Sequence, residues 1–251
     1  MARAEEVIPP VVLDRGPSPR ARFGFVILAG DETSEPDLYG MAPPGVGFHF
    51  SRIESPGFIT AETLSSLMPD MVRAASLILP ARGVDAVCFH CTSGGVLMGE
   101  DNVRKQLARA CPGAVPTTVV SAINHALEVL NIKAFSLLTP YTDDINDAFV
   151  SYFTGHGFQI PRIQGMQFKT DPEIAGVSPE TIVEWAQYSD HDDAEALLIS
   201  CTGLRASGLV SELEERLGKP VLTSNQAALW HMMRTAGLDD HLEGFGMLFE
   251  H

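Results

Sequence analysis

The sequence predicts an α/β protein of two pseudo-symmetric Rossmann-like halves, each a mostly parallel β-sheet flanked by helices. Two observations lead to this prediction. Continuous apolar segments alternate with amphipathic ones, which is typical of strands buried between two layers of helices. The pattern also repeats, because Cys91-Thr92 and Cys201-Thr202 follow similar apolar segments 110 residues apart.

This repeat divides the 251 residues into segments. Residues 1–21 form a proline-containing N-terminal arm, residues 22–132 the first α/β half, and residues 133–237 the second. We expect the C-terminal segment, residues 238–251, to pack back on the first half. Ligands of such sheets bind beyond the carboxyl ends of the strands, so we expect the active site in the cleft between the halves.

Apolar and β-branched segments in the first half predict strands at 23–29, 84–90 and 116–120. Amphipathic segments predict helices at 59–79, 99–110 and 121–132. Thr60 or Thr63 is a candidate N-cap of the first helix, because a hydroxyl there can accept a hydrogen bond from a free backbone N–H.

The same patterns in the second half predict strands at 133–140, 195–200 and 219–224. Predicted helices lie at 143–158, 178–188, 210–218 and 225–238. The helix over 178–188 has the clearest start, with Ser178 as its N-cap and Pro179 in its first position.

Composition limits the partners of the protein. A formal net charge of −15 excludes nucleic acid and membrane surfaces as main partners, since an anionic protein repels nucleic acid and acidic lipid. No run of about 18 or more apolar residues predicts a membrane helix, and the acidic N-terminal segment is unlike a signal peptide. Four cysteines are too few for a disulfide scaffold in this chain. We therefore expect a cytoplasmic protein with reduced cysteines.

Candidate site residues gather where predicted strands end. Asp31, Cys91, Tyr141 and Cys201 all occupy such positions. Because these ends meet at one edge of each sheet, we expect the two thiols to face each other across the cleft. One thiolate can then take a proton from one face of a carbon while the other thiol returns a proton to the opposite face.

Proton removal next to a carboxylate makes an enediolate, whose charged oxygens need preorganised hydrogen-bond donors. A helix N-terminus directly after a cysteine would also lower the pKa of its thiol. We expect both effects at the turns that follow the two cysteines, with Tyr141 adding a phenol. The predicted donors are Thr92, Ser93, Thr202 and Gly203.

Several residues have structural explanations. Cys88 and Cys91 form a C-x-x-C motif, but residues three apart on a strand point to opposite faces. No second ligand pair has zinc spacing, so we predict no metal site and assign Cys88 and Cys111 to the core. Asp31 has an alternative role as a helix N-cap.

Polar residues near the strand ends need separate treatment. We expect His90, His125 and His231 to be structural rather than catalytic. Three further residues follow strand ends and are secondary site candidates: Ser121, Asn225 and Gln226.

These motifs resemble those of the aspartate/glutamate racemase superfamily, in the branch of maleate cis-trans isomerases and arylmalonate decarboxylases. The resemblance covers roughly residues 22–249. Within the branch, the chain is most similar to the ectoine-utilisation A proteins. The resemblance rests on four segments in order: Cys91-Thr92-Ser93, Thr139-Pro140-Tyr141, Ser200-Cys201-Thr202-Gly203-Leu204 and Gly244-Phe245-Gly246.

The resemblance implies a cofactor-independent racemase or isomerase of a small carboxylic or amino acid, with Cys91 and Cys201 as acid and base. It implies no cofactor and no metal, a homo-oligomer of two or more subunits, and a role in ectoine breakdown. It also implies that Asp31, Thr92, Ser93, Tyr141, Thr202 and Gly203 bind the substrate.

Alternatives stay open. An arylmalonate-type decarboxylase would protonate its enediolate from Cys201, but such enzymes lack the first cysteine that this chain has. A maleate cis-trans isomerase would act by thiolate addition, but such enzymes place an asparagine where this chain has Asp31. A small-molecule binder without catalytic activity is the third possibility.

Overall fold

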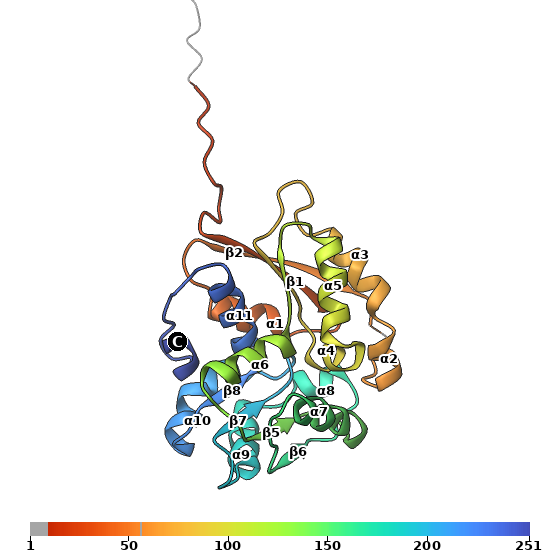
Figure 1. Ribbon diagram of the computed structural model, residues 1–251, viewed down its shortest axis with the longest axis vertical. Coiled ribbons are helices and arrows are strands. Elements are labelled where there is room, and N and C mark those ends of the chain that lie inside the picture. The colour runs from red at the N-terminus through yellow and green to blue at the C-terminus, as the bar shows by residue number, and fades with distance from the viewer. Residues whose placement is uncertain (1–9, 56) are drawn as a thin grey trace, which may run out of the picture.

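The computed structural model describes residues 10–55 and 57–251. Figure 1 shows the first half above the second, with the strands of each half wrapped by helices. Each half contains a four-stranded parallel sheet, with the strand orders β2-β1-β3-β4 and β6-β5-β7-β8. The two orders match strand for strand, which confirms the predicted α/β fold of two similar halves.

Strand β1 (Ala21–Leu28) lies inside the first sheet, and nearly all of its residues are buried. The other strands are β2 (Val46–Ile53), β3 (Ala86–Phe89) and β4 (Val115–Thr118). The helices are α1 (Ser34–Gly40), α2 (Ala61–Ser65), α3 (Met68–Ser76), α4 (Thr92–Met98), α5 (Glu100–Ala110) and α6 (Val119–Val129).

The second sheet consists of β5 (Phe135–Thr139), β6 (Ile163–Gly165), β7 (Ala196–Ile199) and β8 (Val221–Thr223). Its helices are α7 (Asp143–Gly155), α8 (Asp171–Ala175), α9 (Pro179–Ser189), α10 (Val210–Leu217) and α11 (Ser224–Thr235). Short 3-10 helices precede α10 (η1, Ser207–Leu209) and lie near the C-terminus (η2, Met247–Glu250). The predicted N-cap of α9 is confirmed, because the Ser178 side chain accepts a hydrogen bond from the Thr181 N–H.

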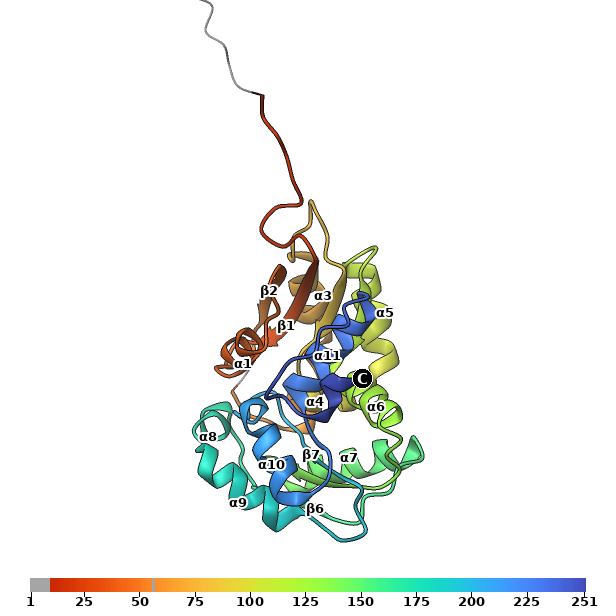
Figure 2. The same ribbon diagram turned by 90° about the vertical axis from the view of Figure 1, so that its left-hand side faces the viewer.

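The last helix of each half joins the halves. Helices α6 and α11 pack against each other, and α11 also contacts β3 and β4 of the first sheet (Figure 2). Both helices start at a threonine whose side chain caps them: Thr118 accepts from Ser121 N–H, and Thr223 accepts from Gln226 N–H. These caps end β4 at Thr118, so the predicted strand over 116–120 is wrong in its last two residues.

The predicted single helix over 59–79 is also wrong. Pro69 has no N–H to donate to the carbonyl of Ser65, so the chain breaks into α2 and α3. The predicted cap at Thr60 is present and forms a capping box with Thr63. For five of the described α-helices and β-strands, all short or at a sheet edge, no residue range was predicted: α1, β2, α4, β6 and α8. Of these, only the starts of α1 and α4 were expected, near Asp31 and after Cys91.

Ends of the chain differ in their packing. Residues 10–13 extend away from the two halves, whereas the Arg15 carbonyl accepts hydrogen bonds from the Arg22 and Arg82 side chains (Figure 1). Residues 1–9 of the expected arm lie outside the described part. The C-terminal segment returns along α11, where Trp230 Nε1 donates to the His251 carbonyl at 3.0 Å and Asp240 pairs with Arg20. In the described residues, no helix has the length and apolar character needed to cross a membrane.

Candidate active site

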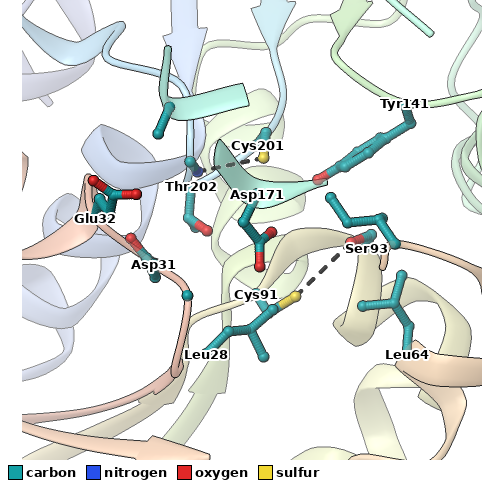
Figure 3. A pocket seen from close by; sticks show the side chains of 14 residues that line it. Leu28, Asp31, Glu32, Leu64, Cys91, Ser93, Tyr141, Asp171, Cys201 and Thr202 are labelled. Carbon is teal, nitrogen blue, oxygen red and sulfur yellow. Dashed lines mark hydrogen bonds between the residues drawn. The ribbon is translucent and has the colours of Figure 1, made fainter. Parts of the chain in front are cut away.

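A pocket lies where the strand ends of the two halves meet. Figure 3 shows the two thiols on opposite sides of it. Seven of the eight predicted site residues line this pocket, which brings together segments from both halves. The lining residues are Leu28, Gly30, Asp31, Glu32, Ile59, Leu64, Cys91, Ser93, Tyr141, Asp171, Ala175, Cys201, Thr202 and Gly203.

Cys91 follows β3 and occupies the N-cap position of α4. Its side chain is buried, and its Sγ lies 3.8 Å from the Ser93 hydroxyl. Burial raises the pKa of the Cys91 thiol to about 11, although hydrogen bonds from the Gly94 backbone and Ser93 act in the opposite direction. The thiol is therefore protonated at neutral pH.

Cys201 follows β7 at the matching place in the second half, but the chain after it forms a turn and not a helix. Its Sγ accepts a hydrogen bond from the Gly203 N–H at 3.3 Å. Burial raises the pKa of the Cys201 thiol to about 12, against the lowering effect of the Tyr141 hydroxyl and the Gly203 N–H. The expectation that helix N-termini lower both thiol pKa values is therefore wrong, because burial is the larger effect.

Tyr141 lies in the wall between the two thiols and is only 2% exposed. Its hydroxyl points into the pocket, as Figure 3 shows. The backbone beneath it is fixed, since the Tyr141 N–H donates to the Thr139 hydroxyl, which donates in turn to Asn146. Burial raises the pKa of Tyr141 well above its usual value, so the phenol is a neutral hydrogen-bond donor.

Thr92 is the one predicted site residue that does not line the pocket. Its hydroxyl is buried and lies 2.9 Å from the Ser224 hydroxyl at the start of α11. The predicted substrate contact through this side chain is therefore wrong, and Thr92 instead joins the two halves. Of the two neighbouring residues, Ser93 is the one that lines the pocket.

Asp31 lines the pocket and also bonds to the start of α1, but Thr33 is the N-cap of this helix, so the alternative prediction of Asp31 as N-cap is wrong by two residues. Its Oδ1 accepts hydrogen bonds from the Thr33 N–H at 2.9 Å and the Ser34 N–H at 2.8 Å, and its Oδ2 accepts the Ser34 hydroxyl. Both carboxylate oxygens thus have partners within the first turn of α1.

Asp171 is a pocket residue that the sequence analysis missed. It is the first residue of α8 and lies between the two thiols in Figure 3. The repeat contained a signal for it, because α2 and α8 both start at a threonine capping box, Thr60 and Thr170, which lie 110 residues apart. The residue after the cap is Ala61 in the first half and Asp171 in the second.

The secondary candidates are structural. The N–H groups of Ser121 and Gln226 donate to the capping threonines Thr118 and Thr223, and the Gln226 amide also donates to the Phe245 carbonyl at 2.6 Å. Asn225 is buried behind the pocket and connects the two cysteine loops. Its Nδ2 donates to the Thr202 carbonyl at 3.1 Å and to Asp37 at 2.9 Å, which leaves its Oδ1 to accept the His90 Nε2–H at 2.9 Å.

Histidine and cysteine residues outside the pocket match their structural assignments. Burial lowers the pKa of His90 to about 4, so its ring is neutral. His125 and His231 pack against each other across α6 and α11, with ring centroids 5.2 Å apart. Cys88 and Cys111 are buried, and the described residues contain no cluster of metal-binding side chains.

The fold and the site together define an α/β enzyme with an aspartate/glutamate-racemase-like fold and two cysteines in one pocket. The family model for arylmalonate decarboxylase matches residues 57–249, and the chain belongs to this family.

Three relatives illustrate its range. The maleate isomerase of Pseudomonas putida is 23% identical over 242 residues, which are 90% of this chain and 96% of that protein. The arylmalonate decarboxylase of Bordetella bronchiseptica is 28% identical over 145 residues, but this match spans only 60% of that protein. A solved structure of a mutant Nocardia farcinica maleate cis-trans isomerase, which carries a covalently bound succinylcysteine intermediate, has a TM-score of 0.84. It is 22% identical and covers 91% of this chain and 98% of that one.

Proposed function

We propose that this protein is a cofactor-independent racemase or isomerase of a small carboxylic or amino acid. One observation carries the proposal: Cys91 and Cys201 line opposite sides of one pocket, each at the end of an equivalent strand. Two thiols placed in this way suit proton transfer on opposite faces of one carbon. A single thiol would suffice for a decarboxylase.

In the proposed reaction, one cysteine first loses its proton to solvent, as it does in a minor fraction of the enzyme at neutral pH, and the resulting thiolate removes the proton next to the substrate carboxylate. The electron pair moves onto the carboxylate oxygens to give an enediolate, and the opposite thiol donates its proton to the same carbon. The Ser93 hydroxyl and the Tyr141 phenol are placed to donate hydrogen bonds to the enediolate oxygens. After turnover the two cysteines have exchanged protonation states, so the reaction can run in either direction.

Two alternative reactions follow from the relatives. A maleate isomerase reaction would add one thiolate to a double bond, allow rotation, and eliminate the thiolate again. An arylmalonate-type reaction would release CO₂ and protonate the resulting enediolate from Cys201. Both substrates are dianions, and three carboxylates in the pocket oppose them: Asp31, Glu32 and Asp171.

Solvent deuterium uptake at the α-carbon tests the proposal. Pooled amino acids, malonates, maleate and acetylated diaminobutyrates, the last as products of ectoine breakdown, are incubated in D₂O with wild type, Cys91→Ala and Cys201→Ala. We expect exchange that requires both thiols. Exchange or CO₂ release that survives in Cys91→Ala would instead establish a decarboxylase, and fumarate formation from maleate would establish the isomerase.

A further inference from the structure

Asp31 and Asp171 are the two half-buried carboxylates of the pocket, and they differ in their hydrogen-bond partners. Asp31 accepts hydrogen bonds on both oxygens from the start of α1. Asp171 is half-buried, and its carboxylate forms no hydrogen bond or ion pair with any residue that the structure describes. A half-buried carboxylate without a partner is unfavourable, and a ligand that supplies a donor or a positive charge removes this cost.

The position of Asp171 is fixed by backbone contacts between the two halves. The Ile59 N–H donates to the Lys169 carbonyl at 2.9 Å, and Phe58 forms an isolated bridge with Thr170. On the pocket side, a Cβ at Gly30 would lie 2.8 Å from the Asp171 Oδ2, so that the carboxylate rests directly against the glycine backbone. Asp171 is therefore held in the pocket by both halves of the chain.

The charged side chains that line the pocket all carry negative charge. Its lining includes the carboxylates of Asp31, Glu32 and Asp171, and among its described lining residues there is no lysine, arginine or histidine. The buried phenol of Tyr141 and the hydroxyl of Ser93 supply neutral donors near the thiols. A ligand with one anionic and one cationic group would therefore find donors for the first and Asp171 for the second.

We infer that Asp171 binds the ammonium group of the substrate, and that the substrates are zwitterionic amino acids with an uncharged side chain rather than dicarboxylates. This inference rests on the proposed function, because the ammonium group and the reacting carbon must occupy the same pocket. Asp171 lies between the two thiols, so an ammonium group beside it would hold the α-carbon between them as well.

Ammonium binding also favours the reaction. The negative charge of Asp171 contributes to the raised pKa of both Cys91 and Cys201. An ammonium group that pairs with Asp171 offsets this charge, so the thiolate forms more readily in the complex than in the empty pocket. A dicarboxylate would have the opposite effect and would disfavour the thiolate.

Matched ligands test this inference by titration calorimetry and by deuterium exchange. The probes are 2-aminobutyrate and Nγ-acetyl-2,4-diaminobutyrate, the same compounds without the amino group (butyrate and 4-acetamidobutyrate), and maleate. The proteins are wild type, Asp171→Asn, and Asp147→Asn, which changes the net charge equally at an exposed position of α7 outside the pocket. We expect amino acids to bind wild type more tightly than their desamino analogues.

In Asp171→Asn this preference should fall by about 10- to 100-fold, the range of a hydrogen-bonded charged contact, while Asp147→Asn retains it. The inference is wrong if desamino analogues bind wild type as tightly, or if Asp171→Asn leaves the preference unchanged. Amino-acid binding that depends on Asp171 without any exchange would overturn the proposed function but not this inference. Deuterium exchange on desamino acids at equal rates in wild type and Asp171→Asn would overturn this inference but leave the proposed function intact.

Discussion

Replacement of Asn225 by leucine should strongly destabilise the protein, because this amide joins the two halves behind the site. The leucine has a similar volume but removes three hydrogen bonds at a position that is 1% exposed. It leaves the Thr202 carbonyl and the His90 Nε2–H without their partners. The Asp37 carboxylate would keep the hydrogen bonds from Ser207, whose hydroxyl lies at 2.7 Å, but would lose the Asn225 amide.

An unsatisfied buried polar group costs about 1–3 kcal/mol, and more when it is charged. For three such groups that relax partly together, we expect a loss of about 3–5 kcal/mol in the free energy of unfolding. Urea denaturation followed by circular dichroism measures this loss. Asn124→Leu is the matched control on α6: its half-buried amide donates only to the Tyr152 hydroxyl, so about 1 kcal/mol should be lost. A loss below about 1 kcal/mol for Asn225→Leu, or equal losses in the two variants, would refute the reasoning.

Three further predictions concern the site. The kcat/KM for exchange should rise about tenfold per pH unit from about pH 7 to 9, where the substrate ammonium group keeps its proton. The reason is that kcat/KM follows the thiolate of the free enzyme, and the pKa values are raised to about 11 at Cys91 and about 12 at Cys201; a plateau below about pH 8 in initial rates would contradict this. Gly94→Ala should reduce exchange by at least about tenfold at unchanged pH, since its Cβ would lie 2.9 Å from the Phe89 ring and 3.2 Å from the Cys91 Sγ. Asp31→Ala should lower the free energy of unfolding by about 1 kcal/mol through loss of its helix-start bonds, whereas Asp31→Asn should retain most of it; equal thermal shifts in the two variants would argue against a capping role.

The strongly patterned parts of the fold could be predicted from the sequence. β1, β3, β5 and β7 are continuous apolar segments buried between helices, and their period is visible in the chain. The edge strands could not be recognised in the same way. Only Phe48 and Ile53 of β2 are buried, and β6 has only three residues, so neither has the continuous apolar character of a central strand.

Pocket residues at the strand ends could be predicted for the same reason, as Cys91, Tyr141 and Cys201 illustrate. Asp171 follows a short edge strand and a loop, so no strand end pointed to it. Thr92 was misassigned because sequence position does not show that its hydroxyl turns away towards Ser224. The thiol pKa values depend on burial, which only the folded pocket determines.

The difference between the two halves has a chemical consequence. The proposed reaction moves a proton between two faces of one carbon and so needs two nearly equivalent acid–base groups. The repeat places two candidates, Cys91 and Cys201, at equivalent strand ends. Recognition of the substrate instead needs two different groups, because the carboxylate and the ammonium group of the substrate require different partners. The repeat is broken at this point: the residue after the helix cap is Ala61 in α2 and Asp171 in α8. The Asp171 carboxylate is thus the asymmetric element that would orient a zwitterion between two equivalent thiols, and Asp171→Asn would remove this asymmetry of charge.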